Sequence, residues 1–327
     1  MISNNLTFKN NIQIKSHKVD FKKLSKKFDK IYLDLKSEIK RTNKTLNVLN
    51  KNFRFSFKIA DFPKNKKYKS IAIIGLGGSI LGAEAIYDFF QSKIKKNIYF
   101  FDNIDENKIT KFKKKENLSK VLYIVISKSG DTVETLSNLF SLNIIKKNAK
   151  NIIIITEKRS NTLFSLAKKF NLFFVEHKNY IGGRFSVLSE VGILPAYLMG
   201  VNISKLRSKI TSCLEKKNKS FIKNSTIKIA NFLNSKNYNN LIFLNYFPEM
   251  QKFLYWGQQL IAESLGKKNK GFLPFVSSAP KDHHSLLQLY LDGPKDKFFN
   301  ICSFEKEFKE KVQTKKTFGY DGFLRNK

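Results

Sequence analysis

The sequence predicts an α/β protein built from parallel sheets that are flanked by helices. Short apolar runs recur along the chain, and each is separated from the next by a segment long enough for a helix. The runs are continuously apolar rather than alternating, which is typical of strands buried on both faces of a parallel sheet. In the first half of the chain the predicted strands cover residues 71–75, 97–101, 121–127, 151–156 and 172–176.

The length of 327 residues is enough for two domains of ordinary size. We expect a helical segment over residues 1–60, a first α/β domain over 61–200 and a second domain over 201–327. The second domain repeats the alternation of the first but stops after fewer elements. Its predicted elements are a strand at 240–247, a helix at 249–266, a strand or loop at 271–277 and a strand at 298–304.

The N-terminal segment has apolar residues at helical spacing within a lysine-rich stretch. Leu24 and Phe28 are four residues apart, and Leu33 and Leu35 continue the apolar series. This pattern predicts one or two amphipathic helices between residues 16 and 57, which cover another part of the molecule.

The formal net charge of +35 raises the question of a nucleic acid or an anionic membrane as partner, because clustered cations bind phosphates. Only six of the 61 basic residues are arginines, and the lysines are spread from Lys9 to Lys327. We therefore predict a solvated lysine-rich surface and no nucleic-acid partner. A nucleic-acid binder is the alternative, and a steep salt dependence of DNA retention would reveal it.

The cysteine pattern and the apolar runs both indicate a cytoplasmic protein. Cys213 and Cys302 have no CxxC spacing, so the sequence supports neither a disulfide nor a zinc site. The N-terminus lacks the apolar core of a secretory signal. The longest apolar run meets Glu84 and Asp88 before it could span a bilayer, so we expect no membrane partner.

A glycine-rich turn follows the first predicted strand and leads into a helix. Gly75 and Gly77 fit a dinucleotide fingerprint, but the third glycine position is Ile80. Gly78 and Ser79 instead bring a hydroxyl to the start of the helix, where we expect Ser79 to be the N-cap beside free N–H groups. The turn predicts a phosphate site, with a tight loop that binds nothing as the alternative.

A second cluster of anion donors follows the strand at 121–127. Three hydroxyls, one ammonium group and a glycine occupy six residues, more donors than a helix cap needs. No G-x-x-x-x-G-K-[ST] motif is present, so a small phosphorylated metabolite is a better ligand than a nucleoside triphosphate. The cluster consists of Ser127, Lys128, Ser129, Gly130 and Thr132, with Asp131 between them.

Two further stretches carry groups suited to acid–base chemistry. Arg184 follows a pair of glycines, a setting in which a guanidinium can stabilise an oxyanion that forms during a reaction. Gln259 and Glu263 lie four residues apart, on one face of the helix at 249–266. A carboxylate partly shielded from water at a cleft is suited to act as a general base, whereas a solvated helix charge is the alternative.

His283 and His284 begin another predicted helix near the end of the second domain. Adjacent side chains on a helix cannot both face one metal ion, so a zinc site is a poor interpretation. We expect one histidine to act as a general acid or base and its neighbour to cap the helix or face solvent.

Five segments of the chain resemble the glucose-6-phosphate isomerase (phosphoglucose isomerase) family, in the order that the family has them. The resemblance extends over about residues 70–290 and is nearest to the shorter bacterial members. It rests on GLGGS, SKSGDTVET, GGRFSVLSEVG, the Gln-x-x-x-Glu-Ser-x-Gly-Lys segment and HHSLLQL.

The resemblance implies a role for each matching position. Glu263 is expected to move a proton between C2 and C1 of the sugar, Arg184 to face the enediolate, and His284 to help open the ring. The implied ligands of the sugar phosphate are Gly78, Ser79, Ser127, Lys128, Ser129, Thr132 and Gln259.

The resemblance also implies two sugar-isomerase domains and a homodimer that acts on glucose 6-phosphate and fructose 6-phosphate. The proton transfer requires no redox cofactor and no metal. Family members continue beyond the position that matches Lys327, so we expect the second domain to be incomplete. A sugar-phosphate sensor without turnover is the alternative, and such a protein would not need Glu263, His284 or Arg184.

Overall fold

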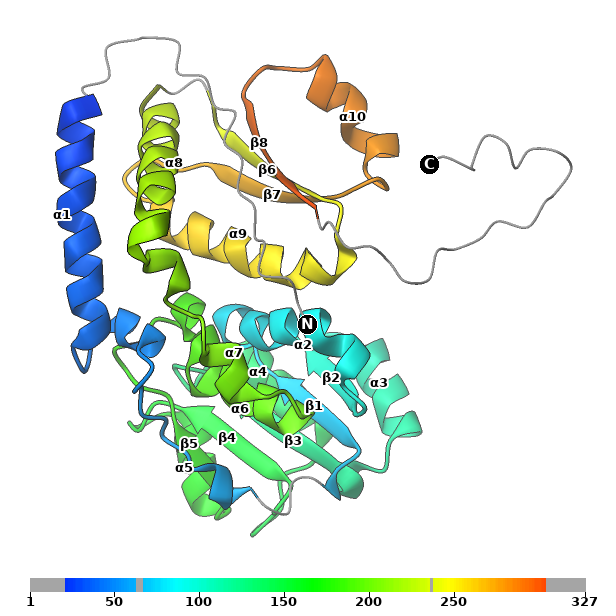
Figure 1. The fold of residues 1–327 in the computed structure, drawn as a ribbon. Coiled ribbons are helices and arrows are strands. Elements are labelled where there is room, and N and C mark those ends of the chain that lie inside the picture. Colours follow the sequence, from blue (N-terminus) through cyan, green and yellow to red (C-terminus); the bar gives the residue numbers. More distant parts are fainter. Residues whose placement is uncertain (1–20, 63–66, 236–237, 304–327) are drawn as a thin grey trace, which may run out of the picture.

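The computed structural model describes residues 21–62, 67–235 and 238–303, and its largest element is a five-stranded sheet. All four strand pairings in this sheet are parallel, in the order β2-β1-β3-β4-β5 (Figure 1). The predicted strands are confirmed to within one residue at either end. They are β1 (Ser70–Ile74), β2 (Asn97–Phe101), β3 (Val121–Ile126), β4 (Ile152–Thr156) and β5 (Phe173–Glu176).

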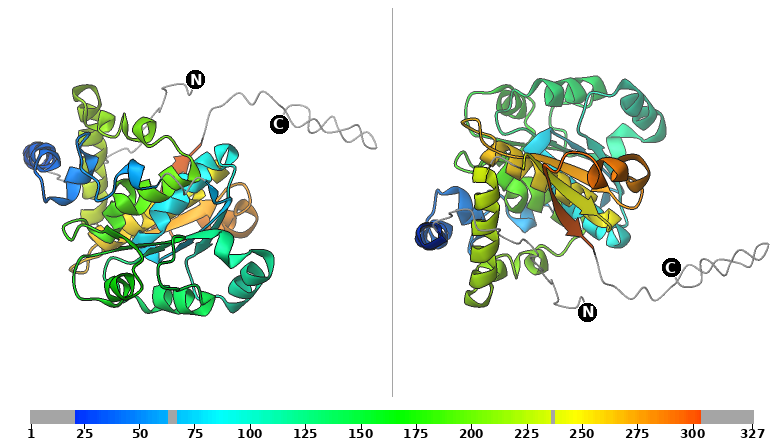
Figure 2. Two further views of the ribbon diagram at one scale, coloured as in Figure 1. Left: turned by 90° about the horizontal axis from the view of Figure 1, so that it is seen from below. Right: turned by 90° about the horizontal axis from the view of Figure 1, so that it is seen from above.

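Helices cover both faces of this sheet, as continuous apolar strands require. Ile71 and Ile73 of β1 pack toward α2 and α6, while Ala72 and Ile74 pack toward α3, α4 and α5. In Figure 2 these last three helices form a row along one side of the sheet. The helices of the first unit are α2 (Leu81–Phe90), α3 (Glu106–Lys115), α4 (Val133–Leu142), α5 (Thr162–Lys169), α6 (Glu190–Met199) and α7 (Ile203–Arg207).

The strand order places a topological switch between β1 and β3. From β1 the chain passes to β2 on one side, and it then returns to β3 on the other side. Ile74 is paired with Val125, so the carboxyl ends of β1 and β3 lie next to each other. In open α/β sheets, ligands bind in the crevice outside the strand ends at such a point.

A smaller parallel sheet of order β7-β6-β8 forms the second unit. Its strands are β6 (Asn240–Asn245), β7 (Leu273–Ser278) and β8 (Lys297–Cys302), and its helices are α8 (Lys216–Ser235), α9 (Gln251–Leu265) and α10 (His283–Leu291). The segment predicted as strand or loop at 271–277 is therefore a strand. Phe304, the end of the last predicted strand, lies outside the described residues.

Helices α9 and α10 lie on opposite faces of the small sheet (Figure 1). Phe298 of β8 packs into the cluster that contains Leu254 of α9, whereas the ring of its neighbour Phe299 stacks edge-on against Tyr290 of α10. Because successive strand residues point to opposite faces, the two contacts assign one helix to each face.

The N-terminal segment has one long helix, α1 (Phe21–Lys40), in its described part. It packs beside α8, and the Tyr32 hydroxyl donates a hydrogen bond to the Leu214 carbonyl at 2.7 Å. The buried face contains Phe28, Tyr32 and Ile39, while Leu33 is 65% exposed, so the predicted apolar face was wrong at Leu33. Residues 1–20 of the predicted helical segment lie outside the described part. No helix in the described part combines the length and apolar character needed to cross a bilayer.

Candidate active site

A pocket of about 340 Å³ opens where β1 and β3 end. Its walls come from the glycine turn after β1, the loop after β3, the loop after β4 and the segment before Arg184. The lining residues are Leu76, Gly78, Ser79, Lys128, Ser129, Thr132, Glu157, Arg159 and Gly183. Five of the predicted phosphate ligands are among them, so the structure brings together two motifs that lie about fifty residues apart in the sequence.

The turn after β1 holds the backbone close to the segment before Arg184. Gly77 has a φ of +53°, and a short 3-10 turn at Gly77–Ser79 precedes α2. A Cβ atom on Gly78 would lie 2.4 Å from the carbonyl carbon of Gly183, so a glycine is required there.

The prediction that Ser79 caps the helix is wrong. Helix α2 begins at Leu81 with Ile80 in the cap position and no side-chain cap bond, because the 3-10 turn intervenes. The Ser79 N–H donates to the Leu76 carbonyl at 3.1 Å, and Ser79 contributes to the pocket wall instead.

The hydroxyls after β3 form a network beneath and within the pocket wall. The Ser127 and Thr132 hydroxyl oxygens are 2.8 Å apart, and the Gly130 N–H donates to Ser127 Oγ at 3.1 Å. Ser127 is 1% exposed, so its hydroxyl holds the loop together from below. Ser129 and Thr132 are both among the residues that line the pocket.

The ammonium group of Lys128 lies on the loop that leads to Arg184. Its Nζ donates to the carbonyls of Asn179 at 2.8 Å and Ile181 at 2.9 Å. It is also 3.6 Å from Glu157 Oε1. In this arrangement Lys128, which is also a lining residue of the pocket, ties the loop after β3 to the segment before Gly182.

Arg184 and Glu263 form an ion pair next to the pocket, although they come from different units of the fold. Arg184 Nη1 is 3.0 Å from Glu263 Oε2, and Gln259 Nε2 donates to Glu263 Oε1 at 2.7 Å. Ser264 Oγ accepts from Arg184 Nε at 3.0 Å, and the Trp256 indole N–H donates to the Arg184 carbonyl at 2.8 Å. The arginine is thus held at both its backbone and its side chain.

The surroundings of Glu263 and Gln259 differ in part from what the sequence predicted. The Glu263 side chain is 46% exposed, so it is shielded from water only in part. Gln259 lies against Gly77, with its Nε2 3.2 Å from the position of a Cβ there. Its amide therefore donates to Glu263 and lies close to the glycine turn, but Gln259 is not among the residues that line the pocket.

His284 and Glu263 are carried by different helices of the second unit. His284 is an exposed residue in the first turn of α10, on the face of the small sheet opposite to α9, which carries Glu263. Its neighbour His283 is hydrogen-bonded to the Tyr246 hydroxyl, with 3.1 Å between Nε2 and Oη. Within the described chain, the structure does not bring His284 to Glu263.

Two charged residues of the pocket, Glu157 and Arg159, were not predicted from the sequence. They follow β4, and Arg159 Nε is 2.7 Å from Glu157 Oε2. The carboxyl ends of neighbouring parallel strands share one edge of the sheet, so the TEKRSN segment after the fourth predicted strand was the available signal.

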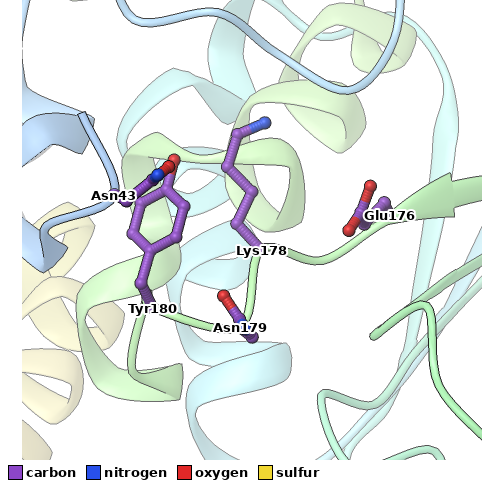
Figure 3. Close-up of a pocket in the computed structure, with 5 residues that line it drawn as sticks. All are labelled: Asn43, Glu176, Lys178, Asn179 and Tyr180. Carbon is purple, nitrogen blue, oxygen red and sulfur yellow. The ribbon is translucent and has the colours of Figure 1, made fainter.

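A second pocket, of about 520 Å³, offers a poorer anion site (Figure 3). It is lined by Asn43, Glu176, Lys178, Asn179 and Tyr180. The ammonium of Lys178 is bound to Ser56 Oγ at 2.8 Å and to Glu190 Oε1 at 3.1 Å. The Lys178 ammonium is thus already paired, and the Glu176 carboxylate in the wall would repel an anion. This pocket lacks the several hydrogen-bond donors that line the pocket at β1 and β3.

The fold and the site together define a doubly wound α/β protein with a carboxylate–guanidinium pair beside a pocket at the switch point of its parallel sheet. A family model described as "Phosphoglucose isomerase" matches residues 21–278. The chain therefore belongs to the phosphoglucose isomerase family.

Individual relatives agree with this assignment. The chain is 36% identical to a glucose-6-phosphate isomerase of Methanocaldococcus jannaschii, over 73% of this chain and 61% of that protein. The chain thus spans less than two thirds of the length of the curated relatives that it matches first.

Two solved structures share the fold at low sequence identity. A hypothetical protein from Thermus thermophilus has a TM-score of 0.73 at 22% identity, over 93% of this chain and 76% of that one. A glucose-6-phosphate isomerase from Chlamydia trachomatis has a TM-score of 0.60 at 20% identity, over 88% of this chain and 56% of that one.

Proposed function

We propose that this protein interconverts glucose 6-phosphate and fructose 6-phosphate by moving a proton between C2 and C1 through an enediolate. The observation that carries the proposal is the Arg184–Glu263 pair, which lies beside a pocket lined with hydroxyls and backbone. Gly183 lines that pocket and directly precedes Arg184, so a ligand held in the pocket extends naturally toward the pair.

The phosphate end of the substrate binds in the pocket at β1 and β3. Ser79, Ser129 and Thr132 supply hydroxyls, and the first turn of α4 adds N–H groups that have no acceptor within the helix. Ser127 keeps Thr132 in place from beneath. Fixing the sugar at one end restricts where C1 and C2 can lie, which lowers the entropic part of the barrier.

At the other end, Glu263 removes the proton next to the carbonyl. Proton removal places negative charge on the carbonyl oxygen, and a preorganised cation must neutralise it. Arg184 is such a cation, since Ser264 and Trp256 hold it in position. Gln259 donates to Glu263 and holds the carboxylate in orientation.

We further propose that the protein acts as a homodimer and that His284 opens the sugar ring. Helices α9 and α10 lie on opposite faces of the small sheet, so this proposal assigns His284 to a site other than the one formed by Glu263 of its own chain. We also propose that residues 61–200 and 201–327 are two sugar-isomerase domains, and that the protein is cytoplasmic.

The experiment that tests this function is exchange of deuterium from solvent into C2 of glucose 6-phosphate. The parent protein should catalyse exchange, and Glu263→Gln should abolish it while glucose 6-phosphate still binds, because only the base is removed. A sensor without turnover would bind the sugar phosphate and show no exchange even in the parent. Exchange by Glu263→Gln near the parent rate would show that another group is the base.

A further inference from the structure

The loop after β4 contributes an arginine to the phosphate pocket. Arg159 lines the pocket together with Ser129 and Thr132, and its side chain is 60% exposed. Its guanidinium is held by Glu157, with 2.7 Å between Nε and Oε2. A mostly exposed side chain anchored at one atom can swing toward a ligand without breaking a packed core.

The backbone of this loop is fixed against the loop after β3. The Asn161 amide donates to the Glu157 carbonyl at 3.1 Å and to the Arg159 carbonyl at 3.2 Å. The Asn161 side chain fills the space beside Gly130, where a Cβ would lie 1.9 Å from its Oδ1. The Thr162 N–H also donates to Asp131 Oδ1 at 2.8 Å. The backbone at Arg159 is therefore tied to the loop that carries the hydroxyl cluster, while its side chain is not.

The two cationic side chains of the pocket wall, Lys128 and Arg159, differ in the groups that they bind. Lys128 holds two backbone carbonyls, so moving its ammonium to a ligand would release the segment that leads to Arg184. The guanidinium of Arg159 is bound by a single carboxylate, and its planar fork matches the oxygens of a phosphate.

We propose that Arg159 binds the phosphate group of the sugar phosphate and exchanges Glu157 for the ligand when it does so. The inference rests on the function proposed above and adds an affinity-determining residue to it. The exchange leaves Glu157 paired, because Lys128 Nζ lies 3.6 Å from its other oxygen. No buried carboxylate is left without a cation, which removes the main cost of the movement.

Calorimetric titration with glucose 6-phosphate and with inorganic phosphate tests this assignment. Arg159→Ala should weaken the binding of both by about tenfold, because a charge-assisted bond to the phosphate is lost. Lys158→Ala is the matched control: it removes one positive charge from the same loop at an exposed position outside the pocket lining, and should bind like the parent. The affinity of Arg159→Lys for both ligands should lie between that of the parent and that of Arg159→Ala.

Equal affinities of the parent and Arg159→Ala would overturn the assignment while leaving the proposed function intact. A parent that binds neither ligand would instead overturn the proposed function, and this inference with it. Equal weakening by Lys158→Ala and Arg159→Ala would show a general charge effect and would also overturn it. If Arg159→Ala does not fold, Arg159→Gln at the same exposed position supports the same comparison.

Kinetics supply a second readout. Arg159 touches the end of the ligand that does not react, so Arg159→Ala should raise KM for glucose 6-phosphate about tenfold and change kcat little. A loss confined to kcat would contradict the proposal.

Discussion

Lys252 of α9 and Glu84 of α2 form an ion pair that joins the two units of the fold, with 2.9 Å between Nζ and Oε1. Glu84 is 3% exposed, whereas about a third of the Lys252 side chain is accessible. Burial raises the pKa of the Glu84 carboxyl, and the Lys252 ammonium acts against that rise. The pair therefore connects the helix after the glycine turn with the helix that carries Glu263.

Lys252→Met should lower the free energy of unfolding by about 2 kcal/mol at pH 8, because it leaves a buried carboxylate without its cation. The raised pKa of Glu84 sets the sign of the pH dependence. Its neutral form is favoured in the folded state, so the loss should shrink as the pH falls toward 4.5, the ordinary value of a glutamate. Urea unfolding at several pH values measures both effects.

The control for this prediction is Lys219→Met, which breaks a half-buried pair with Asp29 but leaves the other Asp29 oxygen paired with Lys223. It should change stability far less. If the loss of stability in Lys252→Met did not depend on pH, Glu84 would not take up a proton in the folded variant.

Gly78→Ala should weaken sugar-phosphate binding and lower stability by about 1–3 kcal/mol, because the new methyl group collides with Gly183. Gly257→Ala is the matched control in α9, where a Cβ would meet nothing within 4 Å. Alanine there should be neutral or should stabilise by up to about 1 kcal/mol, since it favours the helix. Calorimetry and urea unfolding compare the two, and parent-like binding by Gly78→Ala would contradict the close approach of the two loops.

Ser127→Ala and Ser129→Ala should separate support of the loop from contact with the ligand. Ser127 is buried and accepts the Gly130 N–H, so its removal should lower stability by about 1–3 kcal/mol and also weaken binding. Ser129 lines the pocket, so its removal should reduce affinity with little effect on stability. Thermal unfolding and calorimetry provide the two readouts, and equal stability of the two variants would contradict the distinction.

His177 should make the protein less stable in mild acid. The ring is 2% exposed, its Nδ1 donates to the Lys178 carbonyl at 3.1 Å, and burial lowers the pKa of the imidazole. The unfolded chain therefore takes up a proton first as the pH falls below 6.5, and stability decreases from there toward the folded-state pKa.

Urea unfolding between pH 7.5 and 5.5 measures this decrease. His177→Gln should flatten the pH profile, whereas the exposed control His284→Gln should keep it. An unchanged slope in His177→Gln would assign the pH dependence to other groups.

The fold was predictable from the sequence because its strands are buried on both faces. Residues 71–74 and Val121–Ile126 are continuous apolar runs. Such a run can be recognised as a buried strand without knowledge of distant contacts. Local pattern also predicted the start of α10 at His283. The hydroxyl-rich loop was recognisable because six adjacent residues held more donors than a cap requires.

The remaining features of the site depend on tertiary contacts. The direction of the Lys128 side chain is set by carbonyls about fifty residues away, and Arg159 reaches the pocket only because β4 pairs with β3. Ser79 fails as a cap because Gly77 begins a 3-10 turn that delays the helix. The roles of Glu263, Arg184 and His284 in the reaction stay predictions.

The hydrogen bond from Trp256 to the Arg184 carbonyl gives the protein a built-in optical reporter. The sequence contains one tryptophan, so all indole fluorescence originates at this position. Indole emission responds to the loss of a hydrogen bond and to the approach of water, and a displacement of the Arg184 segment would change both. The colour of the emitted light can therefore follow this segment in solution without any label.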